Sequence, residues 1–259
     1  MTSRVSVVVP SYNDAAMLEQ CLTALDAQTR LPDEVVVVDN GSTDATVDVA
    51  VAHGARVVTE LRRGIPQATA AGLDAATGEV VGRLDADSVP PCDWVARVAQ
   101  AFQDEPGLDV LSGPGRYYGV NRLQRWYGER LQMPIYTGPI AWFFGHDVVF
   151  GSNFAIRAEA WRAIRGRVHR DDREIHDDFD IMINLPPGTG VRFDHSLIVD
   201  VSGRPFTSWA RMGRLYRMGL HTFAVNHREQ SLLARRRAWR AWTSGRARPH
   251  PRPSSSPVE

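Results

Sequence analysis

Over its first 112 residues the chain alternates short apolar runs with segments of helical periodicity. After the first run, for example, Leu18, Leu22 and Leu25 recur on one helical face. The apolar runs have the length and composition of buried strands, and they are Val5–Val9, Glu34–Asp39, Arg56–Thr59, Glu79–Asp85 and Asp109–Ser112. Strands that alternate with helices predict an α/β fold with a mainly parallel sheet flanked by helices on both faces.

The alternation ends after Gly113, and residues 116–146 are rich in aromatic residues and arginine instead. The charged segment Gly166–His176 is predicted to be a mobile loop. Further elements are predicted from the later patterns: strands over Val148–Arg157 and Val191–Val201, and helices over Ala158–Ile164, Asp177–Leu185 and Phe206–His227.

Charge is balanced overall but unevenly distributed. All 30 basic residues are arginine and 30 residues are acidic, so no global field argues for a nucleic-acid partner. From Arg228 onward, eight arginines face two glutamates, which gives this stretch a charge of +6 and leaves residues 1–227 at −6. We predict a basic, disordered tail over residues 228–259. Trp239 and Trp242 lie among its arginines, a pattern that suits peripheral contact with an anionic membrane and suits a solvated tail equally well.

Composition also indicates the cellular compartment of the protein. Cys21 and Cys92 match neither a zinc spacing nor a disulfide framework, which favours a reducing compartment. A signal peptide is not expected, because Arg4 precedes an apolar run, Val5–Val9, that is too short. No stretch approaches the ~18 apolar residues of a spanning helix. We expect a cytoplasmic protein, either free or at the inner face of the membrane.

Asp85 and Asp87 follow the fourth predicted strand at its carboxyl end, where α/β sheets bind ligands. An isolated Asp-x-Asp is usually a solvated turn, but this one comes directly after a buried strand. Two carboxylates at this spacing can bind one divalent cation, Mn²⁺ or Mg²⁺, together with the phosphates of a ligand. We therefore expect a metal site here.

Polar residues also follow the first two strands. Pro10, Tyr12 and Asn13 come after the first strand, where a flat aromatic ring can hold a nucleobase. Asp39 ends the second strand and can accept hydrogen bonds from a base or a ribose. A helix cap and an Asx turn are the structural alternatives for these two segments.

Asp177 and Asp178 open a predicted helix. A hydroxyl group that attacks an electrophile must lose its proton, and a carboxylate is a suitable base. Acidic residues are also favoured at helix N-termini for electrostatic reasons alone. For Asp177 the two roles are evenly balanced, and we assign the base to Asp178.

Taken in this order, the segments resemble the family-2 glycosyltransferases of the GT-A fold over about residues 4–220. The matching segments are Pro10–Asn13, Asp39–Asp44, Leu84–Asp87, Gly151–Arg157 and Asp177–Ile181. In the last segment Asp177 replaces the family's Glu and Ile181 replaces its Leu. Each motif is loose alone, but the ordered set is specific.

The resemblance implies a nucleotide-sugar-binding subdomain over 1–115 and an acceptor-binding subdomain over 116–227. It implies inverting, metal-dependent transfer of a sugar from a nucleotide diphosphate sugar, most often a UDP-sugar, to a hydroxyl of a glycan, a lipid-linked or a small-molecule acceptor. The implied roles are Tyr12 and Asp39 at the base, Asp85 at the ribose or metal, Asp87 on the metal, Asp178 as base beside Asp177, and Gly151 and Asn153 on the acceptor side.

Two departures from the family pattern leave questions open. Thr69 and Ala70 stand where the family often has an Arg-Asn pair that meets the donor phosphates, so Arg62, Arg63 or Arg204 would have to replace it. The third metal ligand is unassigned among His146, His176, His195 and His221. The alternatives are a binding subunit without activity and a sugar nucleotidyltransferase. The latter is disfavoured because Pro10–Asp14 is not a basic, Gly-rich loop.

Overall fold

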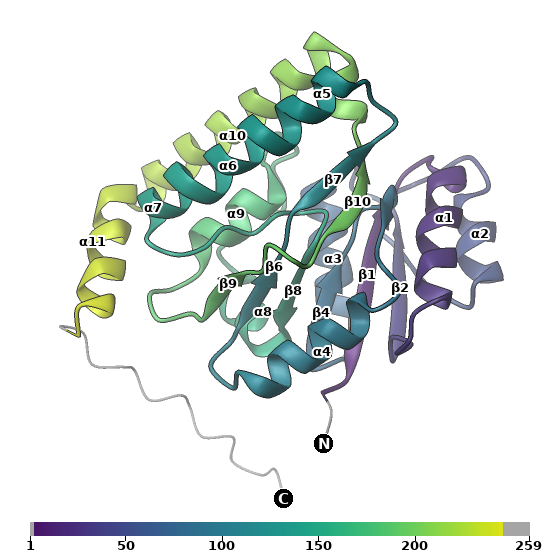
Figure 1. Ribbon diagram of the computed structural model, residues 1–259, viewed down its shortest axis with the longest axis horizontal. Coiled ribbons are helices and arrows are strands. Elements are labelled where there is room, and N and C mark those ends of the chain that lie inside the picture. The colour runs from purple at the N-terminus through teal and green to yellow at the C-terminus, as the bar shows by residue number, and fades with distance from the viewer. Residues whose placement is uncertain (1–2, 246–259) are drawn as a thin grey trace, which may run out of the picture.

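The computed structural model describes residues 3–245, and its centre is a seven-stranded sheet (Figure 1). The strand order is β3-β2-β1-β4-β8-β6-β9. All neighbours are parallel except β8, which runs antiparallel to both β4 and β6. The strands are β1 (Val5–Ser11), β2 (Glu34–Asp39), β3 (Arg56–Thr59), β4 (Val80–Arg83), β6 (Val110–Ser112), β8 (Phe154–Arg157) and β9 (Val191–Phe193).

Both faces of this sheet are buried, because β1 contributes side chains to two separate cores. Val5, Val7 and Val9 pack in one core with helices α1 and α4, and Val8 packs in the other with α3, α8 and α9. A strand buried on both sides is therefore apolar at nearly every position, which is how β1 could be recognised. The helices are α1 (Ala15–Asp26), α2 (Thr46–Ala52), α3 (Ile65–Ala75), α4 (Trp94–Asp104), α8 (Ala158–Ile164) and α9 (Asp177–Asn184).

A second, three-stranded sheet has the order β5-β10-β7. β5 (Ser88–Val89) starts immediately after Asp87, and it pairs antiparallel with β10 (Val199–Ser202). β10 in turn pairs in parallel with β7 (Gly115–Tyr118). The small sheet thus joins the loop that carries Asp85 and Asp87 to the C-terminal half of the chain.

The remaining elements form a helical layer beside the sheets (Figure 1). Residues 122–144 form one continuous helical run, and α10 lies alongside it. The run consists of α5 (Arg122–Trp126), a π-helical segment (Tyr127–Gln132), α6 (Met133–Ile135), a second π-helical segment (Tyr136–Ile140) and α7 (Ala141–Phe144). A 3₁₀ turn (Arg204–Thr207) leads into α10 (Trp209–Glu229), which is followed by α11 (Leu232–Thr243).

The prediction of an α/β fold with a mainly parallel, helix-flanked sheet is confirmed. Two predicted strands need correction. Only the last four residues of Val148–Arg157 form a strand, and Val191–Val201 divides into β9 and the beginning of β10, which belong to different sheets. β8 and β9, which follow residue 115, belong to the main sheet. The division into subdomains 1–115 and 116–227 stays a prediction.

The predicted disordered tail is wrong over residues 228–243, since α11 packs against the body of the protein. Trp239 is buried against His146, with ring centroids 4.5 Å apart. Arg235 donates to the carbonyl of Leu185 at 3.0 Å, and Arg236 donates to that of Phe143 at 3.1 Å. These carbonyls lie at the C-terminal ends of α9 and α7, where helices leave acceptors unpaired. Residues 246–259 of the predicted tail lie outside the described residues.

Within residues 3–245, none of the helices combines the length and the apolar character needed to cross a membrane.

Candidate functional site

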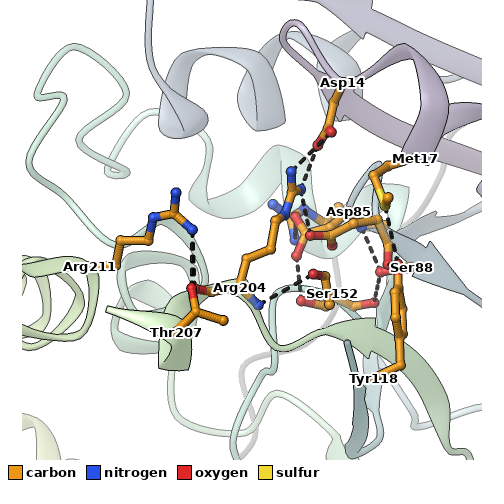
Figure 2. A network of polar contacts seen from close by, with 12 residues as sticks. Asp14, Met17, Asp85, Ser88, Tyr118, Ser152, Arg204, Thr207 and Arg211 are labelled. Carbon is orange, nitrogen blue, oxygen red and sulfur yellow. Dashed lines mark hydrogen bonds and ion pairs between the residues drawn. The ribbon is translucent and has the colours of Figure 1, made fainter. Parts of the chain in front are cut away.

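Asp85 and Asp87 lie in the loop between β4 and β5, held from several sides. The Ser88 hydroxyl accepts from the Asp85 backbone N–H at 3.2 Å, and the Ser152 hydroxyl donates to the Asp85 carboxylate (Figure 2). The Tyr118 hydroxyl donates to the Asp87 carbonyl at 2.8 Å. The two carboxylates are therefore fixed by residues from β5, β7 and the loop before β8.

Arg83, the last residue of β4, is the cation at the centre of the site, and the sequence analysis did not identify it. Its side chain is 2% exposed and forms ion pairs with Asp85 at 2.8 Å and with Asp177 at 3.2 Å. The one available signal was a charged residue inside an otherwise apolar strand, which must find partners when it is buried. Arg83 thus joins the Asp-x-Asp loop to the start of α9.

Asp177 and Asp178 reach the same place from α9 but make different contacts. The Asp177 carboxylate accepts a hydrogen bond from Thr69 at 2.7 Å in addition to the ion pair with Arg83. The Asp178 carboxylate accepts from the backbone N–H of Gly151 at 2.7 Å and contacts the His176 ring. Asp178 is 3% exposed. The four predicted carboxylates are therefore brought together around Arg83, from segments nearly a hundred residues apart in the chain.

Arg204 is the second cation of the site and approaches from the turn after β10. Its guanidinium donates to Asp87 at 2.7 Å and makes two hydrogen bonds to Asp14, at 2.6 and 3.0 Å (Figure 2). Burial, and after it the negative charge of Asp85, raises the pKa of Asp87 to about 6, although Arg204 acts in the opposite direction. At Asp87, burial together with the charge of Asp85 therefore outweighs the contact with Arg204.

The predicted base-binding residues line the ends of β1 and β2. Tyr12 is partly exposed, and the Arg63 guanidinium lies 3.3 Å from the centroid of its ring. Arg63 also donates to the Gly41 carbonyl at 3.2 Å. The Asn13 side chain accepts from the Thr43 backbone N–H at 2.7 Å, which ties the two strand ends together. Pro10 is the penultimate residue of β1 and is only partly buried.

Asp39 is buried and its carboxylate accepts from the Ser42 backbone N–H at 2.9 Å, so it closes the turn that follows β2. This is the turn-forming contact that the sequence analysis weighed against a ligand contact. The adjacent Asn40 also stabilises the chain here, because its side chain donates to the carbonyls of Glu60 and Arg62 after β3. In this conformation Asp39 stabilises the rim of the site.

Gly151 and Asn153, predicted on the acceptor side, differ in position. Gly151 lies against the site, since a Cβ at this residue would come within 2.9 Å of Asp178 Oδ2 and 3.1 Å of an Arg83 nitrogen. Asn153 is fully buried, accepts from the Trp94 indole at 2.9 Å and donates to the Leu197 carbonyl at 2.6 Å. These contacts join the segment before β8 to α4 and to the loop before β10. The assignment of Asn153 to the acceptor side stays a prediction, and with this side chain buried its role there would be indirect.

Of the four histidines considered as metal ligands, only His176 reaches the carboxylates. His146 is half-buried beside Trp239, and desolvation lowers its pKa to about 4. His221 pairs with Asp172 at 2.7 Å, and His195 packs on Phe193. The other ligands of a metal ion would thus have to be carboxylates of the protein or atoms of a bound substrate.

Two groups of side chains in residues 3–245 are candidates for a metal ion. His176, Asp177 and Asp178 place ligand atoms within 4.8 Å of one another. The Arg83 guanidinium does not separate the two groups, because it pairs with Asp177 at 3.2 Å and with Asp85 at 2.8 Å. Asp85 and Asp87 offer carboxylate oxygens, the ligands that hard divalent cations prefer. Asp85 and Asp87 are also partly exposed, whereas Asp177 and Asp178 are buried, so an ion from solvent can reach the first pair more easily. The second group therefore fits a divalent cation better.

The fold is that of an open α/β protein, in which ligands bind beyond the carboxyl ends of the parallel strands, and the acidic, aromatic and basic side chains described above lie at those ends. The family profile described as glycosyl transferase family 2 matches residues 6–165, more than half of the chain. The chain belongs to this family.

Two relatives illustrate the sequence similarity. An uncharacterised glycosyltransferase of Mycobacterium tuberculosis is 41% identical over 113 residues, which are 43% of this chain and 49% of that protein. The glycosyltransferase AglE of Haloferax volcanii is 31% identical over 117 residues, or 42% of this chain and 38% of the relative. Each match thus covers less than half of the length of the relative.

Solved structures share the fold at lower identity. Glucosyl-3-phosphoglycerate synthase from Mycobacterium tuberculosis, in complex with Mn²⁺, UDP and glucosyl-3-phosphoglycerate, superposes with a TM-score of 0.59 at 23% identity, over 90% of this chain and 80% of that one. A mannosyltransferase from Pyrobaculum calidifontis, in complex with GDP-mannose and Mn²⁺, gives a TM-score of 0.64 at 23% identity, over 94% and 74% of the two chains. Both confirm the GT-A architecture.

Proposed function

We propose that the protein transfers a sugar, with inversion, from a nucleoside diphosphate sugar to an acceptor hydroxyl. The observation that carries the proposal is the gathering of four carboxylates at the strand ends of the sheet. The buried Arg83 pairs with Asp85 and Asp177. Asp178 is held beside them by the Gly151 N–H, and Asp87 is held by Arg204. Relatives with this fold have been solved with Mn²⁺ and UDP-glucose or GDP-mannose. The donor of this protein is proposed to belong to the same chemical class, with a UDP-sugar as the first candidate.

Donor binding is assigned to the ends of β1, β2 and β4. Tyr12 and Arg63 present two planar groups that can stack on a nucleobase, and Asp39 holds the turn beside them. A divalent cation held by Asp87 and Asp85 would neutralise the charge that develops on the departing diphosphate. Arg204 is the basic residue proposed to meet the phosphates, because it already reaches Asp87 and is half exposed. Thr69 has another use, the hydrogen bond to Asp177.

Deprotonation of the acceptor is assigned to Asp178 rather than Asp177. The Asp177 carboxylate already accepts a hydrogen bond from Thr69 and pairs with Arg83, so its oxygens are occupied by contacts within the protein. Asp178 forms no ion pair with an arginine within residues 3–245, and the Gly151 N–H and His176 fix its orientation. Its burial means that acceptor binding must open the site locally, since catalytic contacts often form only in the substrate complex.

Nucleotide binding tests the donor site first. Thermal unfolding of the purified protein is followed with UDP, GDP, ADP and CDP, each with and without Mn²⁺. We expect one nucleotide to raise the melting temperature in a metal-dependent way. The rise should be lost in Asp87→Asn and kept in Asp48→Asn, which changes an exposed acidic residue on α2 in the same way.

Turnover then tests the reaction. Sugar-nucleotide cleavage should release a nucleoside diphosphate, whereas release of pyrophosphate would identify a nucleotidyltransferase instead. Asp178→Asn is expected to bind the nucleotide normally and to lower transfer by ~10²–10⁴-fold. Full transfer activity in this variant would remove Asp178 as the base. The anomeric configuration of the product, read by NMR, decides between inversion and retention.

A further inference from the structure

The outer face of the helical layer exposes large apolar side chains in line. On the run 122–144, the exposed apolar residues follow one another at intervals of three to seven: Leu123, Trp126, Leu131, Ile135 and Trp142. On α10, Trp209, Tyr216 and Leu220 share one helical face, at intervals of seven and four. We call these eight residues the apolar stripe.

The two halves of the apolar stripe form one surface. The run and α10 lie side by side (Figure 1), and the hydroxyls of Tyr127 and Tyr216 are hydrogen-bonded to each other. Phe144 and Phe223 stack between the same two helices, with ring centroids 5.7 Å apart. Leu123 lies one helical turn before Tyr127 on the same run, so residues of the stripe flank this contact on both helices. A contiguous apolar surface of this kind marks an interaction site in a soluble domain.

The charges around the stripe are positive. Residues 122–144 and 209–229 contain seven arginines and two glutamates, whereas residues 1–227 as a whole carry −6. Glu129 does not offset the arginines at the surface, because it is turned inward and accepts from the Tyr117 backbone N–H. Glu229 lies at the far end of α10 and pairs with His169. Glu174 pairs with Arg214 and Arg217, at 4.0 and 3.5 Å, but the other five of these arginines have no acidic partner within residues 3–245. The face therefore combines exposed apolar side chains with a net positive charge.

We propose that this face binds an anionic membrane surface, with both helices lying in the plane of the interface. Apolar and aromatic side chains flanked by arginine are the features of helices that lie on a bilayer instead of crossing it. An interface between two copies is disfavoured, because a two-fold contact would place the same arginines against one another. The site of membrane contact is thus moved from the predicted tail, whose Arg235, Arg236 and Trp239 are buried, to the helical layer.

The surface lies next to the catalytic cleft. Trp209, the first residue of the stripe on α10, comes five residues after Arg204, which contacts Asp87. Gln124 of the run donates to the Phe206 carbonyl at 2.9 Å, so both helices are anchored to the turn that carries Arg204. Binding through this face would leave the cleft at the edge of the bilayer. The binding itself does not depend on the proposed activity.

Vesicle co-sedimentation of the full chain tests the proposal. Vesicles of phosphatidylcholine alone are compared with vesicles that contain 30% phosphatidylglycerol. We expect binding to the anionic vesicles only, and a marked loss of binding at 0.5 M salt. Arg122→Gln/Arg130→Gln should weaken the apparent partition coefficient by roughly fivefold per arginine. Neither arginine forms an ion pair within residues 3–245, so the change leaves the fold intact.

A matched pair of variants separates this face from exposed apolar residues in general. Leu123→Ser/Leu220→Ser changes residues that are 73% and 70% exposed on the stripe. Leu31→Ser/Val51→Ser makes the same kind of change at two residues that are each 62% exposed on another part of the surface. The first variant should lose most of its vesicle binding and the second should bind like the unchanged protein.

Three results would overturn the proposal. The first is equal binding by the two serine variants, and the second is no binding of the unchanged protein to anionic vesicles. The third is a concentration-dependent dimer, seen by sedimentation equilibrium, that Leu123→Ser/Leu220→Ser abolishes, because the face would then be an interface between copies. Quenching of tryptophan fluorescence by lipids with brominated chains, reduced in Trp126→Ser/Trp209→Ser, would support insertion of the stripe.

Discussion

Replacing Arg83 with methionine removes the cation around which the site is built. The side chain is 2% exposed and pairs with Asp85 at 2.8 Å and with Asp177 at 3.2 Å. Methionine keeps much of the apolar stem of arginine, so the main effect is the loss of charge. Asp177 would then be a buried carboxylate with only the Thr69 hydroxyl as partner.

The loss of stability follows from the unpaired negative charge that the substitution leaves. Removing one partner of a buried ion pair destabilises a protein by about 3–5 kcal/mol, because the remaining charge is uncompensated. For a chain of this size that corresponds to a fall in melting temperature of roughly 6–20 °C. Arg116→Met is the matched control, since Arg116 pairs with Asp200 at the exposed surface. The control should cost less than about 1 kcal/mol.

Denaturant unfolding of the metal-free protein measures the difference. Combining Arg83→Met with Asp177→Asn should restore part of the lost stability, with a coupling energy of about 1–3 kcal/mol between the two positions. Unfolding midpoints for Arg83→Met and Arg116→Met that agree within error would refute the reasoning. So would strict additivity in the double variant, because Arg83 and Asp177 would then not depend on each other.

Three further predictions concern separate parts of the molecule. Burial acts to raise the pKa of Glu34, but hydrogen bonds from three neighbours outweigh it and lower the pKa from 4.5 to about 2. The unchanged protein should therefore have a higher free energy of unfolding than Glu34→Gln above pH 4.5, and this difference should disappear as the pH falls toward 2. A difference that stays the same at all pH values would contradict the prediction. Trp239→Ala should destabilise the protein by about 3–5 kcal/mol in the same assay, whereas a solvated tail predicts no change. Gly151→Ala should lower sugar transfer by about 10–100-fold while nucleotide-induced thermal stabilisation persists, since its Cβ would crowd Asp178 and Arg83; unchanged turnover would show that the site tolerates a shift of Asp178.

The sequence predicts the main sheet well where a strand or helix has a regular period. Glu34–Asp39, Arg56–Thr59 and Ala158–Ile164 have the predicted bounds, because β-branched runs and a clear helical face identify them. The four clustered carboxylates could be found from motif order alone. Arg83 could not be placed from the motif, since its partners come from α9 and from the loop that follows β4.

Two helical regions were missed for physical reasons. In residues 122–144, two π-helical segments break the period of 3.6, so no single helical face repeats along the sequence. In α11, an arginine-rich composition indicated solvation, but the carbonyls of Phe143 and Leu185 accept hydrogen bonds from two of its arginines. Only the tertiary structure supplies those acceptors.

The small sheet has a consequence for engineering this enzyme scaffold. β5 begins one residue after Asp87, and its partner β10 leads directly to Arg204. A chimera that exchanged the C-terminal half after residue 115 would retain every residue of the Asp-x-Asp loop but replace both the neighbouring strand and the countercharge. The segments before and after residue 115 should therefore be swapped as matched pairs, and a cut within this fold is best placed in an exposed turn away from β5, β7 and β10.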